Sequence, residues 1–188
     1  MNIGKDKIIA TAVELFHEKG YSATTVQDIA NSLNVTKAAL YYYIHSKEEI
    51  LWEIFDKTMN TAEKRIEELL KRDMSVEKSI RALIHNHIMN VRDEAPYMSI
   101  FFTERVHLPL EKQEEIYFRL QTYEKKITFI FHKGISEGAL KSLPVLPTVY
   151  GILGMCNWMY QWYDPKGKLS PEEMAQYYAE IILNGILK

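Results

Sequence analysis

The residues between Thr24 and Lys47 combine hydroxyl, ammonium and phenol groups at spacings that suit contact with a nucleic acid. Thr24 and Thr25 stand at the start of an expected helix, where hydroxyls and backbone amides can face a phosphate. Thr36 and Lys37 stand at the start of the next expected helix, and lysine can bind the O6 and N7 atoms of guanine. These types and positions predict contacts to both the backbone and the base edges of DNA.

Three consecutive tyrosines follow on the second of these helices. Leu40 and Ile44 recur at helical spacing and form its expected buried side. Its outer faces then carry Thr36, Lys37, Ala38, Tyr41, Tyr42 and Tyr43. Tyr43 can stack on a sugar or touch a thymine methyl group. The run of tyrosines alone favours rings that only pack a small domain. Within this motif we expect DNA contact for Tyr41 and Tyr42, and both readings stay open for Tyr43.

Two Glu-x-x-His pairs, Glu14 with His17 and Glu104 with His107, have the spacing of a di-iron site in a helical bundle. Glu14 lies opposite the apolar stripe of its helix, so this pair cannot face a core. The second pair is expected in a solvated turn, and His87 is expected as a hydrogen-bonded core residue. We therefore predict no metal site.

Sequence patterns of the common enzyme sites are absent. No nucleophile-elbow glycines, phosphate loop or dinucleotide fingerprint occur. Nothing supports an enzyme, and we predict neither catalytic residues nor a cofactor.

Local capping signals place these side chains on a helix-turn-helix. Thr25 and Asp28 form a capping box, and Asn34 suits the left-handed conformation that ends a helix. Thr36 can cap the second helix, and Ser46 with Glu49 can open a long third one. A helix, a short turn and a polar-aromatic second helix are the plan of a motif that enters the major groove.

This stretch resembles the DNA-binding domain of the tetracycline-repressor (TetR) family. The matching residues are Thr24, Thr25, Ile29, Ala30, Leu33, Val35, Thr36, Leu40, Tyr41, Lys47, Glu48, Glu49 and Leu51, and Ala12, Leu15, Phe16, Gly20 and Tyr21 fit the preceding helix. By this resemblance, Tyr41, Tyr42 and Lys47 are phosphate-clamp positions. Three positions depart from the family pattern, which usually has Gly at Asn34, His at Tyr43 and Phe at Ile44; the last two bear on which sequence is read.

Composition indicates a globular protein of one or two domains. The 188 residues are 47% hydrophobic and include one cysteine, which fits a reducing, cytoplasmic setting. No secretory signal is expected, and the apolar run 149–163 is shorter than the roughly 18–20 residues that span a bilayer. The net charge of −2 does not by itself indicate nucleic-acid binding. It leaves room for a site in which Lys37, Lys47 and helix N-termini face the duplex.

The rest of the chain predicts an all-α fold of about nine helices, with a DNA-binding domain at residues 1–47 and a ligand-binding and dimerisation domain at 48–188. We expect helices at about 3–19, 47–72 and 75–92, the last stopped by Pro96. A short helix at 97–108 and long helices at 110–136 and 148–163 follow. Asp164–Leu169 is an expected turn, and Ser170, Pro171 and Glu173 cap the final helix.

The last two helices carry more apolar surface than one short chain can cover. The family resemblance implies that they pair with their symmetry mates as a four-helix interface. A homodimer would place its two DNA-binding domains on successive major grooves, about 34–36 Å apart.

Aromatic and methionine side chains of the C-terminal region suggest a small-molecule site. Candidate lining residues, with Arg105 and Asn157 as polar anchors, are Met98, Phe101, Phe102, Arg105, Tyr117, Met155, Asn157, Trp158, Met159 and Trp162. The run from Asn157 to Tyr178 is similar to the tails of TetR-family regulators that respond to acyl-CoA thioesters. That resemblance implies a basic mouth for the CoA phosphates, for which the candidates are Arg105, Arg119, Lys125 and Lys126.

The sequence therefore predicts a dimeric transcriptional repressor that a small apolar effector, such as an acyl-CoA, releases from a palindromic operator. Two alternatives stay open. One is a multidrug-efflux regulator, which would bind diverse cationic or aromatic ligands through acidic side chains. The other is a helical module whose N-terminal domain docks a protein, a reading that the nearly neutral head allows.

Overall fold

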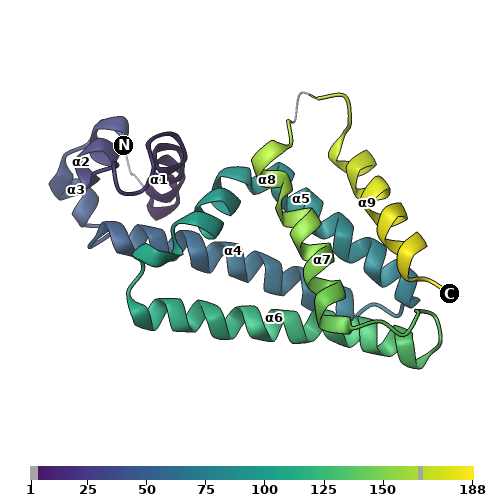
Figure 1. Ribbon diagram of the computed structural model, residues 1–188. Coiled ribbons are helices and arrows are strands. Elements are labelled where there is room, and N and C mark those ends of the chain that lie inside the picture. The colour runs from purple at the N-terminus through teal and green to yellow at the C-terminus, as the bar shows by residue number, and fades with distance from the viewer. Residues whose placement is uncertain (1–3, 165–166) are drawn as a thin grey trace. The chain divides into compact units, whose positions relative to one another are not determined.

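The computed structural model describes residues 4–164 and 167–188, without the side chains of Val91 and Asp93. Ile3 of the expected first helix and part of the expected turn at 164–169 lie outside this range. Within it the fold is all-α, as predicted, and strand pairing is limited to the single bridge Leu140–Leu187. The elements, shown in Figure 1, are α1 (Lys5–Lys19), α2 (Val26–Ser32), α3 (Lys37–Tyr41), α4 (Lys47–Leu70), α5 (Val76–Thr103), the 3₁₀ turn η1 (Arg105–His107), α6 (Leu110–Ser136), α7 (Val145–Asn157), α8 (Met159–Trp162) and α9 (Pro171–Ile186).

The helices form two compact units. The N-terminal unit consists of the residues up to Asn60 together with Pro96–Tyr117, and the C-terminal unit consists of Thr61–Ala95 together with Phe118–Lys188. Helices α4, α5 and α6 each contribute residues to both units. The N-terminal unit thus contains more of the chain than the DNA-binding domain predicted at 1–47, whose functional boundary stays a prediction.

The N-terminal unit is built on buried faces with helical spacing. Its fully or nearly fully buried side chains are Ile8, Ile9, Ala12, Val13, Phe16, Ile29, Ala30, Leu40, Ile44, Ile50, Leu51, Ile54 and Phe55. Gly20 ends α1 with φ 84°, a left-handed value that a side chain rarely adopts. Ser46 caps α4 by accepting the Glu49 amide at 3.1 Å, but the Glu49 carboxylate accepts from the His45 amide at 2.7 Å. The predicted capping box at Ser46 is therefore shifted by one residue.

Two predicted helix boundaries are modified in the structure. The break expected at Pro96 is present as a kink, because α5 consists of two helical segments that meet at non-helical backbone at Glu94 (φ −135°, ψ 30°), and the second segment runs on to Thr103. Proline removes one helical hydrogen bond and clashes with the carbonyl four residues earlier, which bends a helix without having to end it. The helix expected at 148–163 begins earlier, at Val145, and divides at Trp158 into α7 and α8.

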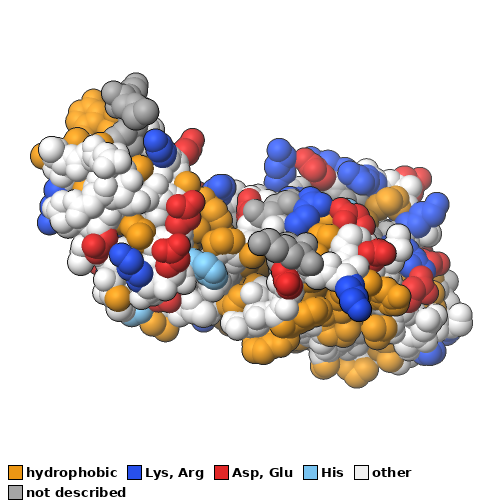
Figure 2. Space-filling view, turned by 90° about the horizontal axis from the view of Figure 1, so that it is seen from above, with side chains coloured by type: hydrophobic (Ala, Val, Ile, Leu, Met, Phe, Trp, Pro, Cys, Tyr) orange, Lys and Arg blue, Asp and Glu red, His pale blue; other side chains and the backbone are white. Residues whose placement is uncertain are grey.

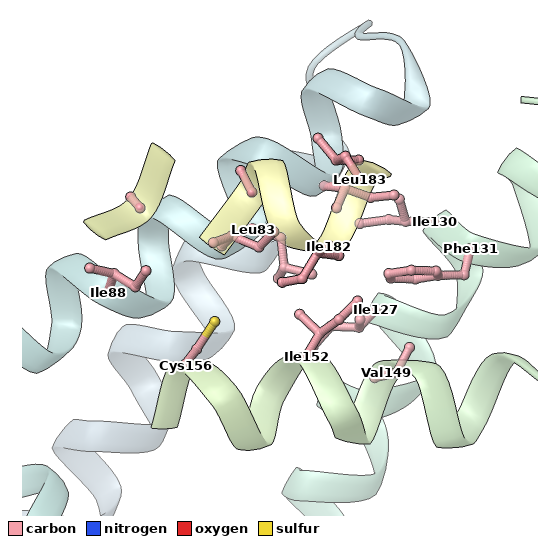
Figure 3. Packing of buried hydrophobic residues seen from close by; sticks show 14 of the residues in the cluster. Leu83, Ile88, Ile127, Ile130, Phe131, Val149, Ile152, Cys156, Ile182 and Leu183 are labelled. Atoms are coloured by element: carbon pink, nitrogen blue, oxygen red, sulfur yellow. The ribbon is translucent and has the colours of Figure 1, made fainter. Parts of the chain in front are cut away.

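The C-terminal unit has one apolar core to which α4 to α9 all contribute. Figure 3 shows part of it, where Leu83 and Ile88 of α5 face Ile152 and Cys156 of α7 and residues of α6 and α9. Two ion pairs join α4 to α6 at its edge, Arg119 with Glu63 at 2.8 Å and Lys126 with Glu67 at 2.6 Å. The capping box of Ser170 and Glu173 opens α9 as predicted.

Candidate DNA interface and ligand-binding residues

Helix α2 and the turn after it are held by short-range hydrogen bonds that the sequence predicts. The Thr25 hydroxyl accepts from the Asp28 amide at 3.1 Å, and the Asp28 carboxylate accepts from the Thr25 amide at 2.8 Å. Hydrogen bonds from the Thr25 hydroxyl and amide lower the pKa of the Asp28 carboxyl. Asn34 adopts φ 55°, which turns the chain, and the Thr36 hydroxyl then caps α3 by accepting from the Ala39 amide.

Helix α3 turns its polar and aromatic side chains outward. Leu40 is buried, whereas Thr36, Lys37, Ala38, Tyr41 and Tyr42 are exposed and Tyr43 is half-buried. The Lys37 ammonium lies 5.7 Å from the centre of the Tyr41 ring. Tyr42 is 82% exposed, so this ring does not pack the domain core. The helix therefore presents the surface that a major groove requires.

Thr24 and Lys47 have structural contacts that the sequence did not reveal. The Thr24 side chain is buried, and its hydroxyl donates to the carbonyls of Gly20 at 2.9 Å and Leu15 at 3.2 Å. The prediction that this hydroxyl faces a phosphate is wrong, because the loop after α1 needs it as a donor. The Lys47 ammonium donates to the carbonyls of Tyr21 at 2.9 Å and Thr24 at 3.0 Å. Its phosphate contact stays a prediction.

The turn η1 contacts the loop that precedes α2. The ring centres of His107 and Tyr21 are 4.9 Å apart, and His107 Nε2 lies 3.5 Å from the Ser22 hydroxyl and 3.3 Å from the Glu104 carboxylate. Lys47 covers the Tyr21 ring at 4.1 Å. Burial, followed by the nearby carboxylates of Glu48 and Glu104, raises the pKa of Tyr21. The Glu104–His107 pair thus lies in an exposed turn, as expected, and His107 also contacts Tyr21 from there.

The ten predicted ligand-binding residues are divided between the two units. Met98, Phe101, Phe102, Arg105 and Tyr117 belong to the N-terminal unit, and Met155, Asn157, Trp158, Met159 and Trp162 belong to the C-terminal unit. Met98 and Met159 are buried, but Phe102, Arg105, Tyr117, Trp158 and Trp162 are exposed. Because these five side chains are exposed in the single chain, their role in lining a ligand site stays a prediction. Composition alone does not separate the inner from the outer face of a helix.

The exposed rings of α7 and α8 continue onto α9 as an apolar face of the C-terminal unit. Its exposed members, which we call the α7–α9 face, are Leu146, Tyr150, Trp158, Trp162, Tyr177 and Ile181. Figure 2 shows apolar side chains gathered on the C-terminal part of the surface. Clusters of exposed apolar side chains are typical of sites where proteins associate.

A chain of polar groups lies inside the C-terminal unit, next to its apolar core. The His87 ring is buried, with Nδ1 3.1 Å from the Leu83 carbonyl and Nε2 3.2 Å from the Tyr123 hydroxyl. This confirms His87 as a hydrogen-bonded core residue. Burial is the main cause that lowers its pKa, and the Arg65 charge acts in the same direction. Sequence reasoning missed Tyr123 and Arg65 as its neighbours.

The described residues contain no group of three or more His, Cys, Asp or Glu side chains that could hold a metal ion. The thiol of Cys156 is buried, and burial raises its pKa to about 12. Within the described chain, every helix is too short or too polar to cross a lipid bilayer.

Comparison with known proteins agrees with this geometry over nearly the whole chain. The chain is 28% identical over 196 residues to the HTH-type transcriptional repressor KstR2 of Mycolicibacterium smegmatis, covering 97% of this chain and 90% of that protein. The structure of KstR2 from Mycobacterium tuberculosis superposes with a TM-score of 0.92 at 24% identity, covering 100% of this chain and 97% of the other. The structure of AibR in complex with isovaleryl coenzyme A and operator DNA gives 0.85 at 26% identity, covering 94% and 96%.

Two family descriptions match separate parts of the chain. Residues 8–54 match "Bacterial regulatory proteins, tetR family", and residues 73–186 match "Tetracyclin repressor-like, C-terminal domain". The second match alone covers more than half of the 188 residues. This chain therefore belongs to the tetracycline-repressor (TetR) family of transcriptional regulators.

Proposed function

We propose that this protein is a homodimeric transcriptional repressor that binds a palindromic operator in the cytoplasm and is released by an acyl-CoA effector. The observation that carries this proposal is the outward-facing α3, with Tyr42 82% exposed behind the exposed Lys37. A solvent-facing helix of this chemistry, held by the Asn34 turn, suits insertion into a major groove.

Contacts to DNA are assigned from exposure. Lys37, with Thr36 and Ala38, would reach base edges, and Tyr41, Tyr42 and Tyr43 would contact the sugar-phosphate backbone or a thymine methyl. Thr25 stands at the N-terminus of α2, where backbone amides attract a phosphate. Lys47 would either position the loop of Tyr21 and Thr24, to which it donates hydrogen bonds, or bind a phosphate directly.

A second copy of this chain is the proposed partner of the α7–α9 face. The rings of Trp158 and Tyr177 are 61% and 57% exposed, and Ile181 is 61% exposed. A twofold interface uses the same patch on both copies, so a self-complementary apolar face suits it. The two DNA-binding domains of a dimer would match operator half-sites that lie one helical turn apart.

The effector proposal is supported by chemistry and by relatives. AibR, which is similar in structure, was solved with isovaleryl coenzyme A and operator DNA. Among described residues the buried polar side chains are Thr24, Thr58 and His87, with no carboxylate among them. A pocket for cations needs buried negative charge, so this pattern favours an acyl ligand over the ligands of a multidrug regulator.

Two of the four residues expected at the mouth of the CoA site are already paired. Arg119 binds Glu63 and Lys126 binds Glu67, so their charges are largely neutralised. Lys125 of the C-terminal unit and Arg105 of the N-terminal unit are exposed. The effector must bind the DNA-incompetent conformation more tightly, because equal affinity for both states would shift neither.

Electrophoretic shift assays with DNA from upstream of the regulated gene test the DNA assignment. Tyr42→Ala and Lys37→Ala should each weaken binding by about 5- to 150-fold, the effect of losing 1–3 kcal/mol. Lys64→Ala, an exposed lysine on α4, is the matched control and should bind as the wild type does. Undiminished binding by both α3 variants would refute the contacts.

Release of fluorescently labelled operator tests the effector assignment. Isovaleryl-CoA and octanoyl-CoA should lower the anisotropy of the wild-type complex, whereas free coenzyme A should not. If no acyl-CoA releases the DNA while a cationic dye does, the multidrug alternative is correct. If wild-type binding to DNA is insensitive to salt, the protein-docking alternative gains the support that the DNA-binding proposal loses.

A further inference from the structure

The tautomer of His87 follows from its two hydrogen-bond partners. The Leu83 carbonyl can only accept, so Nδ1 must carry the proton that it donates over 3.1 Å. In the neutral ring Nε2 is then an acceptor, and the Tyr123 hydroxyl donates to it over 3.2 Å. The Tyr123 oxygen keeps its lone pairs free to accept from another donor. His87 thus fixes the direction of the Tyr123 hydroxyl.

Asn90 lies one helical turn after His87 on α5, on the same side of the helix. Its side-chain oxygen, Oδ1, is buried and has no hydrogen-bond partner in the described structure. A buried acceptor without a donor is costly, and native proteins rarely leave one in place without a reason. The group that is missing here is a hydrogen-bond donor.

Arg65 of α4 approaches the same stretch of α5. Its Nη1 donates to the Asn86 carbonyl at 3.3 Å, and Asn86 precedes Asn90 by one turn. The guanidinium is half-buried and has no carboxylate partner among the described residues. Its positive charge also acts on His87 and Tyr123. A guanidinium has five N–H groups, so Arg65 can donate to a further oxygen.

We propose that Asn90, Tyr123 and Arg65 bind the polar part of the effector, and that this effector is an acyl group with a hydroxyl beside its carbonyl. The inference rests on the proposed acyl effector and names its chemistry. The single hydroxyl proton can be donated to Asn90 Oδ1 or to the Tyr123 oxygen, and the carbonyl oxygen accepts from Arg65. A 3-hydroxyacyl thioester carries both groups two bonds apart along its chain.

The surroundings suit the rest of such a ligand. Tyr123 packs against the apolar core that contains Ile88, Cys156 and Met159, so an acyl chain bound beside Tyr123 would meet apolar side chains. Figure 3 shows Ile88 and Cys156 on the facing surfaces of α5 and α7. The unpaired Arg65 charge disfavours a cationic ligand at the same place.

Calorimetric titration of the full-length protein with octanoyl-CoA and 3-hydroxyoctanoyl-CoA tests the inference. The wild type should bind the hydroxylated ligand about fivefold more tightly or better, the effect of one additional satisfied hydrogen bond. Asn90→Leu, which keeps the branching at Cγ but removes the acceptor, should bind both ligands equally. Asn86→Leu is the matched control, because Arg65 contacts only its backbone, and should keep the preference.

The outcomes separate this inference from the proposed function. Equal binding of both thioesters by the wild type would overturn the hydroxyl assignment and leave the acyl-CoA proposal standing. Binding of free 3-hydroxyoctanoic acid alone, abolished by Asn90→Leu, would support the polar site and reject coenzyme A as part of the effector. A preference that survives in Asn90→Leu would show that the hydroxyl is bound elsewhere and would refute the site.

Discussion

His107 packs against Tyr21, with 4.9 Å between the ring centres and 30° between the ring planes. The same histidine lies beside Ser22, which is 85 positions earlier in the chain. Through this contact, the turn between α5 and α6 supports the loop that leads into α2. Lys47 lies over the Tyr21 ring and donates to two carbonyls of the same loop. The loop that leads into α2 is thus held by residues from both stretches of the N-terminal unit.

His107→Ala should lower the free energy of unfolding by about 0.5–1.5 kcal/mol, the contribution of an aromatic pair beyond its buried area. Urea denaturation followed by circular dichroism measures this change. His132→Ala, at an exposed position of α6, should leave the midpoint within error. Equal effects of the two substitutions would mean that the Tyr21 contact contributes nothing.

Lys47→Met should destabilise the protein by about 1–3 kcal/mol, because the carbonyls of Tyr21 and Thr24 lose a charged donor. Thermal unfolding measures this loss, with Lys64→Met as the exposed control. The salt dependence of DNA binding then separates the two roles of Lys47. An unchanged slope indicates a structural role alone, and a slope reduced by about one indicates a phosphate contact.

The stability of the protein should fall as the pH drops below about 6.5, the ordinary pKa of histidine. The folded state lowers the pKa of His87, so the unfolded state binds more protons in this range and acid favours unfolding. His87 contributes at most about 1.4 kcal/mol per pH unit between its folded and unfolded pKa values. Urea titrations at pH 7.5, 6.5 and 5.5 should show a smaller loss for His87→Gln than for wild type or His132→Gln.

Asn90→Leu should raise the free energy of unfolding by about 1 kcal/mol in the absence of ligand, since it removes a buried acceptor that has no donor. If Asn90 serves ligand binding, the Asn90→Leu protein should be more stable and should also lose its preference for the hydroxylated thioester. Chemical denaturation of both asparagine variants measures the effect. A destabilised Asn90→Leu protein would indicate that Oδ1 already has a donor.

Ile181→Asp should prevent the proposed dimer from forming, because it places a charge on the α7–α9 face. Size-exclusion chromatography with light scattering reports the mass, and operator binding should be lost with the dimer. Val106→Asp changes a side chain of the N-terminal unit that is 72% exposed and should leave the mass unchanged. A wild-type protein of 22.0 kDa by light scattering would reject the dimer directly.

Much of the fold could be predicted because its signals are local. The capping boxes of Thr25 with Asp28 and of Ser170 with Glu173 span three residues, and both form. The left-handed turn needs only Asn34 itself. Helix existence and type follow from such short-range chemistry together with apolar periodicity.

The contacts that define the candidate sites could not be predicted in this way. The pairs Tyr21–His107 and His87–Tyr123 join residues far apart in sequence, and no periodic pattern encodes them. Neighbouring residues also have opposite environments, since Met159 is buried whereas Trp158 is 61% exposed. The local signal of Pro96 predicted the kink in α5 at Glu94, but not that the helix after it ends at Thr103.

The N-terminal unit needs Pro96–Tyr117, a stretch that lies beyond α4 in the chain. Phe101 of that stretch packs 4.9 Å from Phe55, and Lys112 covers the ring of Trp52 at 4.0 Å. A chimaeric regulator joined at residue 47 would therefore combine a foreign helix-turn-helix segment with residues 96–117 of this chain, which are adapted to a different loop. Recombination between relatives should therefore succeed only when residues 1–60 and 96–117 are inherited together.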